Sequence, residues 1–394
     1  MNEPDAKRDP VRADIRTFEP NGIGRISRRG MGRDGLIPLW FGESDLVTPD
    51  FIRAAAKRAL DEGQTFYSAA RGLPRLREGI RDWMARRAAA RVDLERITVP
   101  GSAMLAISMA VQCFARTGDE VVVISPMWPN IFQAIEVAGA VPRFVRLRRD
   151  DDGPWRLDMD ALVAAMGPRT KAVFFASPSN PTGWIMSVDE QRVLLDVCRK
   201  CGIGIIADEV YGPIVFDGTH APTFASLADP EDDVFVVHSF SKAWAMTGWR
   251  IGWMIHPASL ADPIAAMTVA ANTGAASFVQ AGAIAAIEHG DAFVDALRDR
   301  CRENRDRLES FVASHQRLSW AAPPGGFYGF VAIDGMTDSM AFAEHLLDIA
   351  NVGVAPGMAF GAPGDAVNER HIRICIAYDP GRFAEALERF AAAL

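Results

Sequence analysis

Short apolar runs alternate with helical patterns through the middle of this chain, and this alternation limits the possible folds more than any other feature of the sequence. The runs cover residues 97–100, 121–125, 172–176, 203–207, 234–239 and 251–255. Strands that alternate with helices favour a sheet covered by helices on both faces, with its strands largely parallel. The sequence therefore predicts an α/β fold whose main sheet is mixed but mostly parallel.

The pattern changes after Gly290. Apolar residues then recur near every fourth position, which indicates a long helix. Further strands are expected at 327–333 and 371–377, and further helices at 338–350 and 380–394. We expect an N-terminal arm with the first strand at 1–48, packed with the small domain, a large domain at 49–290, and a smaller α+β domain at 291–394.

Composition excludes several classes of function. The chain has 394 residues and a net charge of −8, without a basic run to follow a phosphate backbone, so nucleic acid is not an expected partner. No apolar stretch has membrane length and residues 1–20 lack a signal-peptide core, so we expect a cytoplasmic protein without a membrane partner. The odd number of cysteines argues against a disulfide framework. Cys198 and Cys201 are interpreted as ordinary helix residues, and no metal site is expected.

One lysine, Lys242, has an unusual chemical context. It follows the apolar run 234–237, has the hydroxyls of Ser239 and Ser241 beside it, and precedes Arg250 by eight residues. Apolar neighbours and a second cation disfavour the ammonium form, so the lysine becomes an amine nucleophile near neutral pH. Hydroxyls and a guanidinium are the donors that a phosphate needs. Together they suggest pyridoxal phosphate, although Lys242 alone is better explained as a surface lysine.

Five motifs occur in order and at spacings that are jointly specific. They are Asn180-Pro181-Thr182-Gly183, Asp208-Glu209-Val210-Tyr211, Ser239-Phe240-Ser241-Lys242, Gly248-Trp249-Arg250-Ile251-Gly252 and the late Arg373. On these motifs the chain resembles the fold-type I pyridoxal-phosphate enzymes, specifically the class I/II aminotransferases of the aspartate aminotransferase type. The resemblance runs from about residue 36 to the C-terminus, and it implies a large cofactor-binding domain with a smaller α+β domain.

The resemblance implies a role for each candidate cofactor contact. Lys242 would hold pyridoxal phosphate covalently, and Tyr211 would donate to the ring oxygen. Asp208 would face the protonated pyridine nitrogen, because a carboxylate buried at a strand tip is costly without a cation. These three are the candidate catalytic residues. The complete expected cofactor-binding set is Tyr67, Ser102, Ala103, Met104, Trp128, Asn180, Asp208, Tyr211, Ser239, Ser241, Lys242 and Arg250.

Several of these positions have a plain structural alternative. Ser102, Ala103 and Met104 open a helix whose free N–H groups suit a phosphate, yet a glycine turn before a helix is common. Trp128 lies between two prolines, which suits stacking on a ring, and core packing is the rival interpretation. Tyr67 would reach the phosphate of a neighbouring subunit, which implies a homodimer with shared active sites. Its alternative is a core tyrosine.

The resemblance implies that Gly42, Asn180 and Arg373 bind the substrate, with Gly42 and Arg373 at its α-carboxylate, and that the Asn180 amide also donates to the cofactor's ring oxygen. Gly42 would bring backbone close to the carboxylate, with a plain turn glycine as the alternative. Arg373 stands between apolar neighbours, where a charge without a carboxylate partner is wasteful. Beyond this turn, Thr48 is expected to cap a helix that begins at Pro49.

The predicted activity is transamination between an L-amino acid and a 2-oxo acid. A β-eliminating lyase or an amino-acid decarboxylase of the same fold remains the alternative, and a non-catalytic effector module of a regulator is a second one. Residues 251–297 contain no lysine or arginine, and Ser102 stands where some bacterial relatives have a lysine. Neutral or aromatic substrate side chains are therefore favoured, although Arg28 or Arg29 of the arm could supply a cation for a distal carboxylate.

Overall fold

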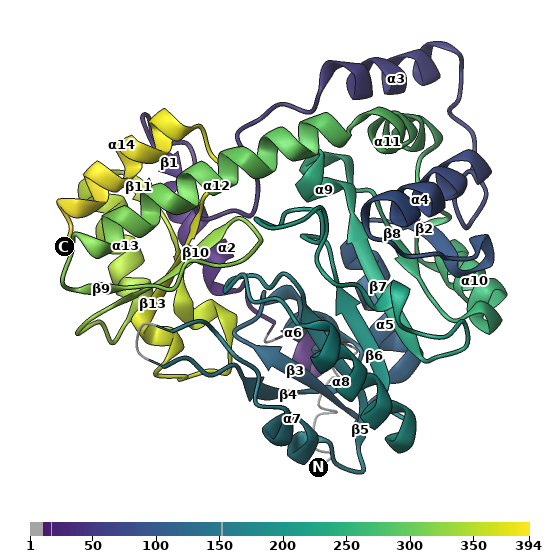
Figure 1. Ribbon diagram of the computed structural model, residues 1–394, viewed down its shortest axis with the longest axis horizontal. Helices are drawn as coiled ribbons and strands as arrows, with labels where there is room; N and C mark the ends of the chain where they lie inside the picture. The colour runs from purple at the N-terminus through teal and green to yellow at the C-terminus, as the bar shows by residue number, and fades with distance from the viewer. Residues whose placement is uncertain (1–10, 17, 151–152) are drawn as a thin grey trace, which may run out of the picture.

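Two units lie side by side in this computed structural model, which describes residues 11–16, 18–150 and 153–394 (Figure 1). The larger unit is built on a seven-stranded sheet and the smaller one on a four-stranded sheet. Residues 1–10 and 17 of the predicted arm lie outside the described residues. The exact limits of the two domains stay a prediction.

The large sheet is mixed and mostly parallel, as the alternation of strands and helices predicts. Its spatial order is β2 (Ile97–Gly101), β8 (Gly252–Ile255), β7 (Val234–Ser239), β6 (Gly204–Asp208), β5 (Thr170–Ala176), β3 (Glu120–Ser125) and β4 (Val141–Arg146). Strand β8 runs antiparallel to both of its neighbours, and every other pairing is parallel. The carboxyl ends of β3, β5, β6 and β7 therefore meet at one edge, which is where ligands gather in such sheets.

Helices cover both faces of this sheet because its strands are apolar on both sides. The helices of the large unit are α3 (Asp50–Asp61), α4 (Pro74–Arg87), α5 (Ala103–Phe114), α6 (Asn130–Val137), α7 (Met159–Ala165), α8 (Val188–Cys201), α9 (Phe240–Ala243), α10 (Ala261–Asn272) and α11 (Ser277–His289). In β3, Val121 and Val123 pack with α5, α6 and α10, whereas Val122 and Ile124 belong to the core formed with α4, α7 and α8.

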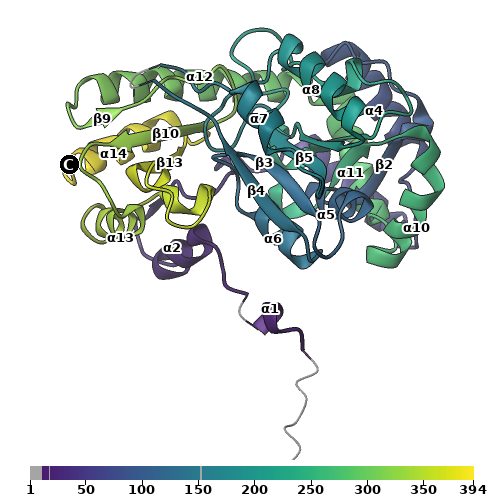
Figure 2. The same ribbon diagram turned by 90° about the horizontal axis from the view of Figure 1, so that it is seen from below.

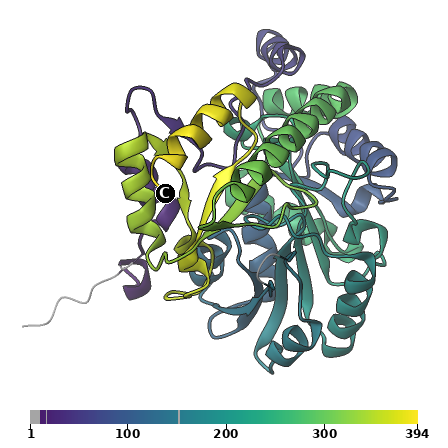
Figure 3. The ribbon, with the colours of Figure 1, turned by 60° about the vertical axis from the view of Figure 1, so that its left-hand side comes forward.

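The small unit combines an antiparallel sheet with three helices. Its strand order is β12 (Ala355–Pro356), β13 (His371–Cys375), β10 (Tyr328–Ile333) and β9 (Leu318–Ser319), and its helices are α12 (Asp291–Ala313), α13 (Ser339–Ala350) and α14 (Pro380–Ala391). Helix α12 runs from the large unit to the small one and lies along the top of the molecule in Figure 2. In Figure 3 the yellow and lime elements of the small unit lie beside the teal strands of the large sheet.

The arm joins the small unit through one helix and one short strand. Helix α2 (Gly22–Gly30) packs against α13 and β12, and β1 (Ile37–Pro38) pairs in parallel with β11 (Val352–Gly353). The short helix α1 (Ala13–Arg16) stands away from the body of the molecule (Figure 2).

The prediction that Thr48 is the N-cap of α3 was wrong by one residue. Pro49 occupies the N-cap position, and no side chain caps the helix. The Thr48 hydroxyl instead donates to the Ala245 carbonyl at 2.5 Å. This contact ties the start of α3 to the segment just after α9, so tertiary packing has replaced the local capping bond.

Candidate active site

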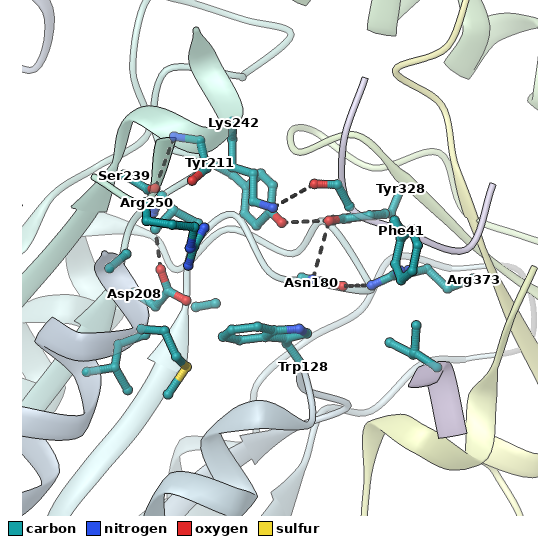
Figure 4. Close-up of a pocket in the computed structure, with 18 residues that line it drawn as sticks. Phe41, Trp128, Asn180, Asp208, Tyr211, Ser239, Lys242, Arg250, Tyr328 and Arg373 are labelled. Carbon is teal, nitrogen blue, oxygen red and sulfur yellow. Dashed lines mark hydrogen bonds between the residues drawn. The ribbon is translucent and has the colours of Figure 1, made fainter. Parts of the chain in front are cut away.

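A pocket of about 170 Å³ lies where the carboxyl ends of the parallel strands face the small unit (Figure 4). Twelve of the fourteen site residues expected from the sequence line it, and the two exceptions are Ser102 and Tyr67. Its charged lining residues are Lys242, Arg250, Arg373 and Asp208. Three cationic groups against one carboxylate make this a pocket for an anionic ligand.

Lys242 lies on the single turn of α9, directly after β7. The turn is stabilised by the Ser239 hydroxyl, which accepts a hydrogen bond from the Ser241 N–H at 3.0 Å. This connection points Lys242 into the pocket, where Nζ donates to the Gly42 carbonyl at 2.6 Å. Burial, and after it the charge of Arg373, lowers the pKa of Lys242 to about 8. The chain thus offers a buried amine that loses its proton near neutral pH.

Asp208 is the last residue of β6 and pairs in register with Val237 of β7. Its side chain is 5% exposed, and burial raises the pKa of its carboxyl group to about 7. The carboxylate accepts a hydrogen bond from the Val210 N–H at 3.3 Å. Among the described residues it forms no ion pair within 4.0 Å. A cationic group of a ligand would therefore stabilise its ionised form.

Anion donors gather around Arg250. This residue has a left-handed backbone with φ +54°, a conformation that non-glycine residues adopt at some energetic cost and that clusters at functional sites. Its Nη1 donates to the Thr247 carbonyl at 2.8 Å. Ser239 lies beside it in Figure 4, and the register partner of Ser239, Gly252, runs close to the first N–H of α5. A Cβ on Gly252 would lie 2.9 Å from the Ala103 nitrogen, so glycine permits this approach.

Arg373 of β13 forms the other cationic end of the pocket and is 1% exposed. Its Nη1 donates to Asn180 Oδ1 at 2.9 Å, and its Nη2 donates to the Trp40 carbonyl. The guanidinium also lies 4.5 Å from the ring centre of Tyr328. Its buried Nε has no hydrogen-bond partner among the described residues. A buried guanidinium with an unused donor is prepared for an anionic ligand such as a carboxylate.

The sequence interpretation missed Tyr328. This residue comes from β10 of the small unit, and its hydroxyl lies 2.6 Å from the hydroxyl of Tyr211. Asn180 Nδ2 donates to the same Tyr328 oxygen at 3.4 Å. Strand periodicity predicted a buried strand here but could not tell which of its residues faces the other unit. A tyrosine in an otherwise apolar strand is the one signal that pointed to it.

Apolar side chains form the remaining walls. Trp128, from the loop after β3, lies across the pocket floor in Figure 4, facing Tyr211 and Lys242. Phe41, Ile107 and Ile23 also line the pocket and were not singled out from the sequence. Ile23 comes from α2 of the arm, for which the sequence favoured a place across a partner subunit or the active-site mouth without singling out any apolar residue.

Two of the expected residues lie elsewhere in the single chain. The Ser102 hydroxyl caps α5 by accepting a hydrogen bond from the Leu105 N–H at 3.2 Å. The residues that follow it, Ala103 and Met104, do line the pocket. Tyr67 is 89% exposed on the loop between α3 and α4, where it borders a separate hollow with residues 272–278.

Two further features are absent from residues 11–16, 18–150 and 153–394. Within these ranges, no group of three His, Cys, Asp or Glu side chains is placed to hold a metal ion. Within the same residues, no helix combines the length and apolar character needed to cross a membrane.

Comparison with known proteins identifies the family of this chain. The family model described as aminotransferase class I and II matches residues 36–390. A probable aspartate/prephenate aminotransferase of Aquifex aeolicus is 32% identical over 373 residues, which cover 93% of this chain and 92% of that protein. An arginine–pyruvate transaminase of Pseudomonas aeruginosa is 33% identical over 368 residues, covering 93% and 91%.

The fold also matches solved structures. A mutant aspartate aminotransferase of Thermus thermophilus superposes with a TM-score of 0.88 at 29% identity, and the match covers 98% of this chain and 100% of that one. The pocket described above therefore sits in an architecture that is shared along the whole chain.

Proposed function

Because this chain belongs to the class I and II aminotransferases, a family that depends on pyridoxal phosphate, we propose that it transfers an amino group between an L-amino acid and a 2-oxo acid at Lys242. The observation that carries the proposal is the buried amine of Lys242, held between anion donors around Arg250 on one side and the buried guanidinium of Arg373 on the other. An amine nucleophile between two anion sites suits a phosphorylated aldehyde and an amino-acid carboxylate.

The residues of the pocket fit pyridoxal phosphate. Arg250, Ser239, Ser241 and the N-terminus of α5 would be the donors for its phosphate, and α5 is long enough to add a favourable dipole. Asp208 would be the counter-charge for its ring nitrogen. When bound, the cofactor supplies an aldehyde for covalent attachment and a ring that accepts electrons.

The chain's own groups supply positioning and proton transfer. Arg373 holds the substrate carboxylate and so fixes which bond at Cα is broken. Lys242 Nζ, with its pKa lowered to about 8, would take the Cα proton as a general base and, as a general acid, deliver it to the carbon that the cofactor supplies as its aldehyde. Asn180 and Tyr211 contribute donors beside this amine, and Trp128 forms a flat apolar wall opposite it.

We favour amino acids with neutral or aromatic side chains as the substrates. Apolar residues, Ile23, Phe41 and Ile107, line the pocket beside Trp128, and no charged residue beyond the four already named lines it. The two arginines that could have changed this are exposed: Arg28 does not line the pocket, and Arg29 pairs with Asp348 at 2.6 Å. The relatives are named for substrates as different as aspartate and arginine, so their names do not decide the question.

A homodimer with shared active sites is also part of the proposal. Phe66 and Tyr67 are 84% and 89% exposed, which is unusual for aromatic side chains on a surface loop. A second copy of the chain would bury them and would bring Tyr67 to the phosphate end of its pocket. The cytoplasmic location stays a prediction from the sequence.

Two experiments test the activity. Borohydride reduction of the cofactor-loaded protein, followed by digestion, should place the cofactor's mass on the peptide that contains Lys242; an adduct on another peptide refutes the site. A panel of amino donors with 2-oxoglutarate as acceptor should then show neutral or aromatic donors reacting fastest. A single turnover distinguishes the alternative: a transaminase leaves the cofactor as its amine, whereas a lyase releases ammonia and leaves the aldehyde.

A further inference from the structure

Four buried side chains in the pocket form one continuous series of hydrogen bonds (Figure 4). Arg373 Nη1 lies 2.9 Å from Asn180 Oδ1, and Asn180 Nδ2 lies 3.4 Å from the Tyr328 hydroxyl. The Tyr328 hydroxyl lies 2.6 Å from that of Tyr211. The series runs from Arg373 on β13 of the small unit to Asn180 in the loop after β5, then to Tyr328 on β10 and to Tyr211 in the loop after β6, so it crosses between the two units.

The direction of each proton follows from what each group can donate. A guanidinium only donates, so Asn180 presents Oδ1 to Arg373 and turns Nδ2 toward Tyr328. An amide NH2 group only donates as well, so the Tyr328 oxygen accepts. Burial raises the pKa of both tyrosines, and each therefore keeps its single proton at neutral pH. Among the described residues, the Tyr211 oxygen is the one remaining partner for the Tyr328 proton.

This order leaves the Tyr211 proton free for a ligand. Once the Tyr211 oxygen accepts from Tyr328, its own O–H bond turns away from Tyr328 and is available to the pocket. The opposite direction would leave the Tyr328 proton buried without an acceptor, which costs free energy. Tyr328 therefore decides where the proton of its neighbour points.

We propose that Tyr328 is a positioning residue that aims the Tyr211 proton into the pocket and couples it to the charge of Arg373. The inference rests on the proposed function, since the acceptor of that proton is the ring oxygen of the bound cofactor. Hydrogen bonds in a buried network polarise one another. A substrate carboxylate that binds Arg373 reduces the polarisation of the Asn180 amide by the guanidinium. Substrate binding therefore weakens the hydrogen bond that Tyr211 donates.

A substitution at Gly42 displaces the same hydroxyl without removing it, and the added Cβ would reach Lys242 Nζ only at 3.4 Å, an ordinary van der Waals distance. A Cβ at this position would collide with the Tyr328 oxygen. Gly42→Ala therefore pushes the hydroxyl away from Tyr211 while keeping both tyrosines. Tyr328→Phe, by contrast, removes the hydroxyl and keeps the ring that packs against Arg373.

The readout is the pH midpoint at which the absorbance of the cofactor bound to Lys242 changes. A donor to the ring oxygen lowers this midpoint, because it stabilises the extra negative charge of the deprotonated form. Tyr211→Phe should raise the midpoint by about one pH unit, and Tyr328→Phe by about half a unit, roughly threefold in proton affinity. Gly42→Ala should shift it in the same direction as Tyr328→Phe.

Two comparisons separate this role from a general loss of structure. The double variant Tyr211→Phe/Tyr328→Phe should match Tyr211→Phe alone, since Tyr328 acts through Tyr211. Tyr378→Phe is the matched control, because it removes another buried hydroxyl, one that donates to the Pro38 carbonyl at 2.8 Å outside the pocket. It should leave the midpoint unchanged.

Each outcome supports or overturns the inference. Equal midpoints for wild type and Tyr328→Phe, with Tyr211→Phe shifted, overturn it and leave the proposed function intact. Additive shifts in the double variant overturn it too, because Tyr328 would then act on its own. If Tyr328→Phe does not fold, Gly42→Ala decides by the same criteria. A wild-type protein that forms no covalent complex with pyridoxal phosphate would instead refute the proposed function.

Discussion

Asp208→Asn should stabilise the cofactor-free protein at alkaline pH and weaken its response to the cofactor. Asparagine has the shape of aspartate and can still accept the hydrogen bond from the Val210 N–H, so packing is preserved. It cannot ionise, however, and the cost of burying a charge disappears. The same change removes the counter-charge proposed for the cofactor's ring nitrogen.

The magnitude follows from the raised pKa of this carboxyl group. Burial moves the pKa of Asp208 from 3.8 to about 7, so the folded protein holds the proton more tightly than the unfolded chain does. The resulting stabilisation is complete below pH 3.8 and is lost as the pH rises toward 7. At about 1.4 kcal/mol per unit, wild type loses roughly 3 kcal/mol of this stabilisation between pH 5 and pH 8. The variant loses none of it.

Denaturant unfolding of the two cofactor-free proteins at pH 5 and pH 8 measures this difference. The neighbouring carboxyl of Glu209, whose pKa burial raises to about 8, titrates in both proteins and largely cancels in the comparison. We expect the free energy of unfolding of the variant, relative to that of wild type, to be about 3 kcal/mol higher at pH 8 than at pH 5. Added pyridoxal phosphate should raise the melting temperature of wild type more than that of the variant. If the free energies of unfolding of the two proteins changed in parallel with pH, the burial cost assigned to Asp208 would be refuted. If pyridoxal phosphate raised both melting temperatures equally, the counter-charge role of Asp208 would be refuted.

Three further outcomes follow from the site. Arg373→Lys keeps the charge but cannot donate to both Asn180 Oδ1 and the Trp40 carbonyl as the guanidinium does, so kcat/KM for an amino donor should fall about 10- to 100-fold, and a smaller loss for amines without a carboxylate would support the carboxylate role. In the cofactor-free protein, acylation of Lys242 should rise with a midpoint near pH 8, because burial lowers its pKa; a midpoint near 10.5 would contradict this. Tyr67→Phe should weaken cofactor binding severalfold, measured by equilibrium titration, because it removes a donor to the phosphate of the partner's site, while sedimentation should show the same dimer as for wild type.

Much of the fold could be predicted because its signals are local. Apolar runs of strand length, separated by helical patterns, indicated the mixed, mostly parallel sheet, and the change after Gly290 indicated the second unit. The cap at Thr48 failed because a contact between distant residues, Thr48 and Ala245, outweighed the local bond. Local capping preference is worth about 1 kcal/mol, which a tertiary contact readily exceeds.

In the candidate site, too, some residues could be placed from local sequence and others only from the tertiary structure. Lys242 and Ser239 belong to one strand–turn–helix connection, so the local conformation of residues 239–242 determines how they lie relative to each other. Asp208 and Lys242 come together because adjacent parallel strands end at the same edge of a sheet. By contrast, no sequence pattern predicted that Ile23 of the arm would form a wall of the pocket.

Local sequence was enough to specify the sheet, the lysine with its anion donors and the buried carboxylate, because each depends on side-chain periodicity or on neighbours within one connection. Tertiary packing was needed to bring Tyr328 to Tyr211, to pair Arg29 with Asp348, and to leave Tyr67 facing outward. These contacts depend on how the arm and the two units pack against each other. The burial of apolar surface over the whole chain brings these distant residues together. It depends on all the packed elements at once, so no short stretch of sequence can predict it.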